Sequence, residues 1–198
     1  MDDPVYKAAL ARLVALLDEA RLRGLPNFDC AALATCSSDA RPSVRMINVF
    51  VPQNDGAVMF FANRLSGKGC QLTGNPRAAL CFYWSELQEQ VIVEGNVKEA
   101  SEAESDRLWG RRTRESQLAA WAAPQGETVA ERGAVRQHVQ KFRKQSGFDR
   151  VPRQSDWYAY SLEPDRIEFW PSGWHRAKER VRFVAGEAGR WSSEMVSP

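Results

Sequence analysis

The sequence predicts a single α+β domain built around an antiparallel sheet. Two observations carry this prediction. Short segments rich in valine, isoleucine, phenylalanine and tyrosine occur early and late in the chain, and helical patterns lie between them. The chain has 198 residues, without an internal repeat or a linker, which fits one domain with its own core.

The first elements follow from apolar spacing and turn chemistry. Residues 4–24 carry apolar side chains at helical intervals and end at Gly24 and Pro26, which predicts one amphipathic helix. A short helix is expected from Ser66 to Leu72, with Ser66 as its N-cap. Turn sequences such as Pro-Gln-Asn-Asp-Gly separate the first predicted strands. These strands are 30–37, 43–51, 57–63, 77–84 and 90–99.

The middle of the chain is predicted to be helical and its end to return to strands. Ser101 opens a helix that runs to about Arg112, because Glu102 and Glu104 in its first turn oppose the positive end of the helix dipole. Two more helices are expected at 115–123 and 129–145. The late strands are predicted at 156–162, 165–170, 179–184 and 189–196.

Composition excludes several classes of function. The net charge is +2, so no global field favours nucleic acid or a membrane surface. The basic stretch from Arg132 to Arg153 is interpreted as a solvated helix face, with an anion-binding patch as the alternative. No apolar run approaches the length of a membrane span and no signal peptide is evident, so a cytoplasmic location is expected. The four cysteines show no metal or redox spacing and are expected to be buried thiols.

Common catalytic motifs are missing too. There are two histidines and no nucleophile elbow, and neither glycine-rich nucleotide motif occurs. Cationic and amide side chains instead gather near strand ends, where a phosphate or a heterocycle with carbonyl groups could bind. Each of them taken singly is more often a surface residue. They are Arg45, Lys68, Gln90, Gln125, Arg176 and Arg180.

Several long blocks in order resemble the pyridoxamine 5′-phosphate oxidase family. They include PSVRMINVF at 42–50, VMFFANRLSGKGCQLTGNPRAALCFYW at 58–84, QVIVEGNVKEA at 90–100, RESQLAAWAAPQ at 114–125 and IEFWPSGWHRAKERVRF at 167–183. The resemblance implies an FMN-binding split β-barrel with surrounding helices that works as a homodimer, with FMN at the subunit interface. Residues 1–25 would form the N-terminal helix, and 26–198 the barrel and remaining helices.

The same resemblance assigns the cofactor contacts. Arg45 and Lys68 would meet the FMN phosphate, and Gln90 would come from the partner subunit. Family members often have an arginine where this chain has Gly67, and Arg64 is a candidate to replace that missing cation. The full set of expected FMN-binding residues is Arg45, Met46, Ile47, Phe61, Ala62, Lys68, Gln90, Gln125, Trp170 and Arg180.

The substrate side departs from the vitamin oxidases of the family. Phe50 stands where they have a phosphate-binding lysine, and Leu108 where they have a tyrosine. A pocket with these changes suits a flat aromatic heterocycle with one carboxylate better than a phosphate dianion. The expected substrate-binding residues are Phe50, Leu108, Arg112, Ser116, Arg176 and Lys178.

Three functions are therefore considered. The favoured one resembles the FMN-dependent oxidases of phenazine biosynthesis, in which a reduced tricyclic substrate is oxidised on the flavin and O2 reoxidises it, without a catalytic side chain. The second is a pyridoxine or pyridoxamine 5′-phosphate oxidase, supported by Arg112, Ser116 and Arg176. The third is a flavin- or haem-binding barrel without catalysis. No metal-binding site residues are expected.

Overall fold

The computed structural model describes residues 3–52, 57–122, 133–145, 151–171 and 180–197, in which helices and strands follow the predicted order. The elements are α1 (Pro4–Leu22), β1 (Cys30–Cys36), β2 (Pro42–Phe50), β3 (Val58–Asn63), α2 (Gly67–Gly74), β4 (Arg77–Trp84), β5 (Glu89–Glu99), α3 (Glu102–Trp109), α4 (Arg114–Ala122), α5 (Ala134–Gln145), β6 (Trp157–Pro171), β7 (Arg180–Ala185), the 3-10 helix η1 (Glu187–Gly189) and β8 (Trp191–Val196).

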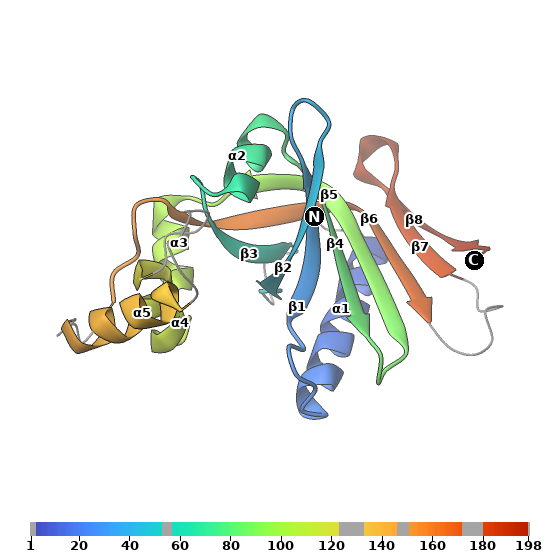
Figure 1. Cartoon of the computed structure of the whole chain (residues 1–198). Helices are drawn as coiled ribbons and strands as arrows, with labels where there is room; N and C mark the ends of the chain where they lie inside the picture. Colours follow the sequence, from blue (N-terminus) through green and yellow to red (C-terminus); the bar gives the residue numbers. More distant parts are fainter. Residues whose placement is uncertain (1–2, 53–56, 123–132, 146–150, 172–179, 198) are drawn as a thin grey trace.

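Six of the strands close into an antiparallel barrel. They follow the order β3-β2-β1-β4-β5-β6, and β3 also pairs with β6, so the two ends of this row meet (Figure 1). The last two strands, β7 and β8, extend the sheet beyond β6. Closure leaves no unpaired edge among the six barrel strands. The predicted split barrel with surrounding helices is confirmed.

One strand boundary was predicted wrongly. Residues 156–162 and 165–170 were expected to be two strands, but β6 is one strand of 15 residues. Its first part pairs with β3 and its last part with β7, while β5 runs along the other edge. Proline removes a ladder donor, so Pro164 between the two expected strands would favour a break. It lies, however, opposite an irregularity between Glu94 and Gly95, where the β5–β6 ladder shifts its register.

Gly95 explains how β5 and β6 pack at this irregularity. A Cβ atom at this position would lie 2.1 Å from the carbonyl oxygen of Glu163. Only a residue without a side chain permits so close an approach of the two backbones. Gly95 thereby lets β6 serve as a partner of β3 and of β7.

The N-terminal helix is tied to the end of the chain. Tyr6 and Leu13 of α1 are buried in the barrel core, and α1 contacts β7 and β8. Asp3 caps the helix, since its Oδ1 accepts hydrogen bonds from the backbone N–H groups of Val5 at 2.8 Å and Tyr6 at 3.2 Å. Its Oδ2 accepts from the N–H of Trp191 at 3.0 Å. One carboxylate therefore joins α1 to β8.

We expect the stability contributed by Asp3 to depend on pH. The hydrogen bond from Trp191 and those from the helix N-terminus hold the pKa of Asp3 below its ordinary value of 3.8. A depressed folded-state pKa stabilises the fold above the ordinary value and loses this effect as pH falls through the folded-state pKa. Asp3→Ala should lower Tm at pH 7, and the difference from wild type should shrink below pH 3.8. Asp3→Asn retains a capping side chain, so its Tm at pH 7 should lie between those of wild type and Asp3→Ala. Equal melting temperatures for all three proteins at pH 7 would contradict this role of Asp3.

The sheet is apolar on its outer face as well. Along β1 and β4 every second residue is buried, so Ala32 and its cross-strand neighbour Cys81 face away from the core. Val44 and Met46 of β2 are 70% and 65% exposed, and Tyr83 of β4 is 61% exposed. Contiguous exposed apolar side chains are typical of protein–protein contact surfaces. This face is therefore a candidate surface for a second copy of the chain.

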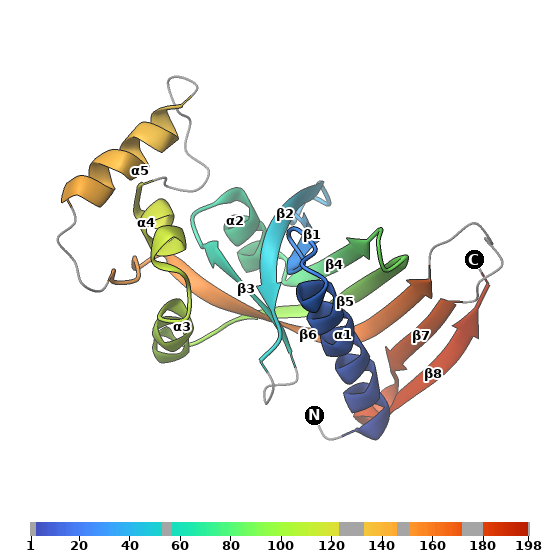
Figure 2. The same cartoon turned by 90° about the horizontal axis from the view of Figure 1, so that it is seen from below.

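The helices α3, α4 and α5 gather at the opposite end of the molecule from β7 and β8 (Figures 1 and 2). Trp121 of α4 stacks on Phe142 of α5 with 5.8 Å between ring centroids. Arg136, Lys141 and Lys144 of α5 are exposed, which agrees with a solvated basic face. Within the described residues, no helix is long and apolar enough to cross a membrane.

Two expectations about thiols and metals can be compared with the described residues. Cys30, Cys36 and Cys81 are partly buried, but Cys70 is exposed, so the prediction of four buried thiols was wrong. Cys70 lies on the short helix α2, in which Gly69 and Leu72 are the buried residues, so the Cys70 side chain is left towards solvent. In the described ranges, no group of three or more histidine, cysteine, aspartate or glutamate side chains could hold a metal ion.

Candidate functional site

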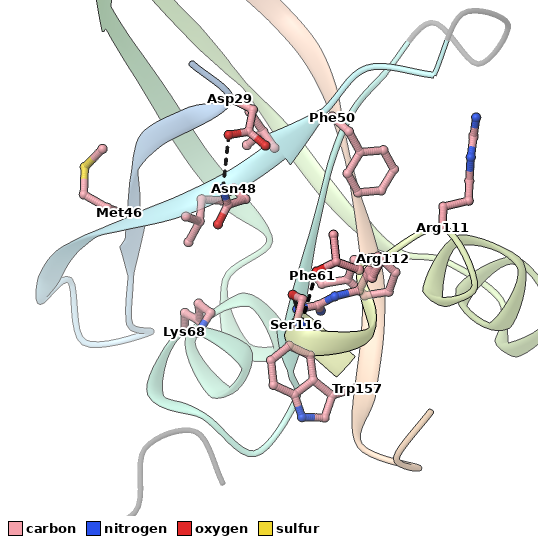
Figure 3. A pocket seen from close by; sticks show the side chains of 13 residues that line it. Asp29, Met46, Asn48, Phe50, Phe61, Lys68, Arg111, Arg112, Ser116 and Trp157 are labelled. Carbon is pink, nitrogen blue, oxygen red and sulfur yellow. Dashed lines mark hydrogen bonds between the residues drawn. The ribbon is translucent and has the colours of Figure 1, made fainter. Parts of the chain in front are cut away.

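A cavity of about 490 Å³ lies between β2, β3, α2 and the segment that joins α3 to α4 (Figure 3). It brings together residues that are more than 80 positions apart in the sequence, from Asp29 to Trp157. Seven of its lining residues belong to the expected cofactor and substrate sets: Met46, Ile47, Phe50, Phe61, Lys68, Arg112 and Ser116. The other lining residues are Asp29, Asn48, Val49, Arg111, Thr113 and Trp157.

Arg112 is the central cation of this cavity. Its guanidinium carbon lies 5.0–5.2 Å from the ring centroids of Phe61, Trp109 and Trp157. Its Nη2 donates a hydrogen bond to the Ser116 hydroxyl at 2.6 Å. Burial lowers the pKa of Arg112 to about 10, so the side chain remains charged at neutral pH. Within the described part of the chain, no carboxylate lies within 4.0 Å of it. A desolvated cation held in this way is suited to an anionic group of a ligand.

The neighbouring wall is aromatic. Phe50 stacks on Phe61 with 5.9 Å between ring centroids and an interplanar angle of 29°. Phe61 in turn meets Trp109 edge to face, with 6.2 Å between centroids. Figure 3 shows Phe50 and Arg111 on one side of the cavity and Lys68 on the other. The wall offers a flat apolar surface beside the Arg112 guanidinium.

A pair of cations, Lys68 and Arg45, lies towards α2. The pKa of Lys68 is lowered to about 8, first by burial and then by the nearby charge of Arg45. Arg45 donates to three neutral oxygens: the Leu33 carbonyl at 3.2 Å, Thr35 Oγ1 at 2.6 Å and Gln71 Oε1 at 3.2 Å. Ser66 caps α2, so the positive end of the helix dipole adds to the field of the two cations. Two cations and a helix N-terminus make this corner attractive to a phosphate.

Three further described cofactor candidates lie at the far end of the sheet. Gln90 and Trp170 are cross-strand partners on β5 and β6. Arg180 places its guanidinium carbon 4.0 Å from the centroid of the Trp170 ring. Trp157, which lines the cavity, precedes Trp170 on the same strand by 13 residues, or about 43 Å at about 3.3 Å per residue. One chain therefore holds two separate parts of the expected site.

Besides Arg45 and the three residues at the far end of the sheet, two more predicted residues do not line the cavity. Ala62 is fully buried in the barrel core, because Phe61 and Ala62 face opposite sides of β3. Leu108 is 2% exposed and packs with Met59 and Ala159 beneath the aromatic wall. Any contact of Leu108 with a substrate would be indirect, through Phe50 or Phe61. Three further predicted residues lie outside the described residues: Gln125, Arg176 and Lys178.

The cavity also contains residues that the sequence analysis missed. Asn48 could have been found, since it alternates with Met46 and Phe50 along β2, and it donates to Asp29 Oδ1 at 3.2 Å. Arg111 directly precedes Arg112 but is exposed at the edge of the cavity. Trp157 gave no sequence signal of its own, because only barrel closure brings β6 next to β3.

Arg64 does not supply the cation that Gly67 lacks. Its guanidinium forms an ion pair with Glu99 and lies 4.1 Å from the Tyr158 ring centroid. It lines a separate cavity of about 470 Å³ together with Thr73 and Tyr160. Arg64 is thus engaged at a cavity other than the one that Lys68 lines.

Family models match almost the whole chain. Residues 17–146 match the model described as "Pyridoxamine 5′-phosphate oxidase", and residues 157–198 match "Pyridoxine 5′-phosphate oxidase C-terminal dimerisation region". The chain belongs to the pyridoxamine 5′-phosphate oxidase family. The dimerisation region contains β6, β7 and β8, and therefore Trp170 and Arg180. Membership supports a homodimer.

Individual relatives carry two different kinds of name. The chain is 35% identical to a pyridoxine/pyridoxamine 5′-phosphate oxidase of Verminephrobacter eiseniae over 100% of its own length and 92% of the relative. It is 38% identical to the enzyme of the same name from Anaeromyxobacter dehalogenans, covering 99% and 96% of the two chains. Among solved structures it is similar to PhzG from Burkholderia lata in complex with tetrahydrophenazine-1-carboxylic acid, with a TM-score of 0.85, 27% identity and coverage of 100% and 98%.

Proposed function

We propose that the chain is an FMN-dependent oxidase of a reduced, flat heterocycle that carries a carboxylate, with a dihydrophenazine carboxylate as the substrate class and O2 as the electron acceptor. The observation that carries this proposal is the environment of Arg112. A single desolvated guanidinium lies beside the stacked rings of Phe50 and Phe61, so one anionic group and one aromatic surface can be bound together.

The residues at α2 fit the cofactor proposed here. Lys68 and Arg45 would hold the FMN phosphate, since the two cations lie close enough for the charge of Arg45 to lower the pKa of Lys68, and the N-terminus of α2 adds to their field. When bound, FMN would accept the electrons of the substrate and return them to O2. The protein then needs to orient the substrate and to exclude water; a side chain that acts as a general base is not required.

The substrate proposal rests on what surrounds Arg112. Phe50 places a phenyl ring where vitamin oxidases of the family have a lysine for the substrate phosphate, and Leu108 is a core residue without a hydroxyl. Loss of two charge-assisted contacts disfavours a phosphate dianion by several kcal/mol, at about 1.5–3 kcal/mol for each. The similarity to PhzG, solved with a tetrahydrophenazine carboxylate, supports the same ligand class.

A second candidate function is oxidation of pyridoxine or pyridoxamine 5′-phosphate. It is favoured by the Arg112–Ser116 pair, which could hold a phosphate, and by the names of relatives that are 35% and 38% identical to this chain. The two candidates share the fold and the flavin, so they differ only in the anion and the ring that the cavity accepts.

The flavin part of the proposal is tested by the purified protein itself. We expect a yellow homodimer that releases about one FMN per chain on denaturation, because each of two interface sites would take residues from both copies. The visible spectrum, the released flavin and light scattering measure this. A colourless protein that takes up neither FMN nor FAD, or a flavin-loaded monomer, would refute it.

Gly67 offers a way to strengthen the phosphate site. A Cβ atom at Gly67 would have no neighbour within 4 Å, so a larger residue fits at the first turn of α2 beside Lys68. Gly67→Arg should tighten FMN binding by about tenfold through one added charge-assisted contact. Gly67→Ala is the control for the loss of glycine flexibility. Fluorescence titration with FMN would show equal affinities for the two variants if the phosphate bound elsewhere.

A further inference from the structure

Glu168 is a buried carboxylate outside the cavity. It lies on β6 with 5% of its surface exposed. Each of its oxygens accepts from a different arginine of β7: Oε1 from Arg180 Nη1 at 3.2 Å and Oε2 from Arg182 Nε at 3.1 Å. Burial of a carboxylate is costly unless it is paired and hydrogen-bonded, and the two arginines meet this need.

The same carboxylate fixes the guanidinium of Arg180. On one side this group lies over the Trp170 ring, at 4.0 Å from the centroid, and on another it donates to Glu168. Its Nε is buried and has no acceptor among the described residues. A guanidinium held by a ring and a carboxylate, with one donor unused, is oriented towards a further ligand.

We infer that Glu168 is a positioning residue for the flavin, acting through Arg180. This inference rests on the proposed FMN function. Arg180 and Trp170 are expected to bind FMN because they match FMN-binding positions of the family. Glu168 itself contacts two arginines and lines neither of the two cavities described above. Its role is to hold the Arg180 guanidinium in one orientation over the Trp170 ring, as a supporting shell does for a binding group.

A role for Glu168 in charge neutralisation alone predicts the opposite change in FMN affinity. If Glu168 served only to neutralise the two arginines, its loss would leave more positive charge near the site and would tighten binding of anionic FMN. If it positions Arg180, the loss releases a long side chain that must be ordered again on binding, and FMN binds more weakly. The direction of the change therefore separates the two roles.

A double-mutant cycle on FMN affinity tests the inference. Glu168→Gln retains the size of the side chain and should weaken FMN binding by about tenfold. In an Arg180→Ala background the same substitution should have no further effect. The control is Glu194→Gln, which alters an exposed carboxylate that contacts Arg182 at 3.3 Å and makes no contact with Arg180; its FMN affinity should equal that of wild type.

Three outcomes would overturn the inference. Tighter or unchanged binding in Glu168→Gln would exclude positioning, and so would an equal loss in the Arg180→Ala background. A wild-type protein that binds no flavin would overturn the proposed function and this inference together, whereas the first two outcomes leave the function intact. Should Glu168→Gln fail to fold, Glu168→Asp retains the charge with a shorter reach, and we expect it too to weaken FMN binding; unchanged affinity would again exclude positioning.

Discussion

Arg112→Met is expected to lower kcat/KM for a dihydrophenazine carboxylate by about 10- to 150-fold. The substitution removes a charge-assisted contact worth about 1.5–3 kcal/mol, while the methionine chain still fills the space between Phe61, Trp109 and Trp157. Arg112→Lys should recover part of the loss, because it restores the charge without the planar fork that donates to Ser116. Oxygen uptake at varied substrate concentration measures the effect.

The control for this experiment is Arg41→Ala. Arg41 has 84% of its side chain exposed and pairs with Asp39 in the turn between β1 and β2, away from the cavity. We expect wild-type kinetics for it. A pH profile adds a second check: since the pKa of Arg112 is about 10, KM of wild type should rise as pH approaches that value. Wild-type kcat/KM in Arg112→Met would show that the carboxylate binds elsewhere.

Lys68→Ala is expected to weaken FMN binding by about 1.5–3 kcal/mol, the range for a hydrogen bond to a charged group. Wild-type affinity should itself fall as pH rises through about 8, because the pKa of Lys68 is lowered to that value by burial and by Arg45. The phosphate remains a dianion in this range, since its second pKa is about 6. The fall in FMN affinity should therefore reflect deprotonation of Lys68.

The matched variant is Lys68→Arg. A guanidinium retains its charge well above pH 8, so its FMN affinity should stay level where that of wild type declines. Fluorescence quenching of FMN between pH 7 and 9 compares the two proteins. If Lys68→Ala kept full affinity and the pH profiles were identical, the phosphate would have to lie in another cation cluster.

Much of the fold could be predicted from the sequence because local signals agree with one another. The first five strands and the caps Ser66 and Ser101 occur where apolar alternation and turn residues placed them. The continuity of β6 could not be predicted, since it depends on the tertiary fit of Pro164 beside the irregularity at Gly95. Considered without its tertiary surroundings, Pro164 favours a break in β6.

The site could be predicted only in part, for a related reason. The resemblance assigned Met46, Phe50 and Phe61 by position in matched motifs, and all three line the cavity. Ala62 and Leu108 were assigned by position in matched motifs, but burial is decided by which face of a strand or helix meets the core. The separation of Trp170 and Arg180 from the cavity follows from the length of β6, which local sequence signals did not predict.

The measurement that tests the central claim most directly is anaerobic reduction of the bound flavin by each candidate substrate. Mixed with a dihydrophenazine carboxylate, the protein should lose its yellow absorbance rapidly and regain it when O2 is admitted. Pyridoxine and pyridoxamine 5′-phosphate should bleach it slowly or not at all, because Phe50 and Leu108 offer their phosphate no hydrogen bond. Rapid bleaching by the vitamin phosphates with none by the dihydrophenazine, or no bleaching by either, would contradict the account.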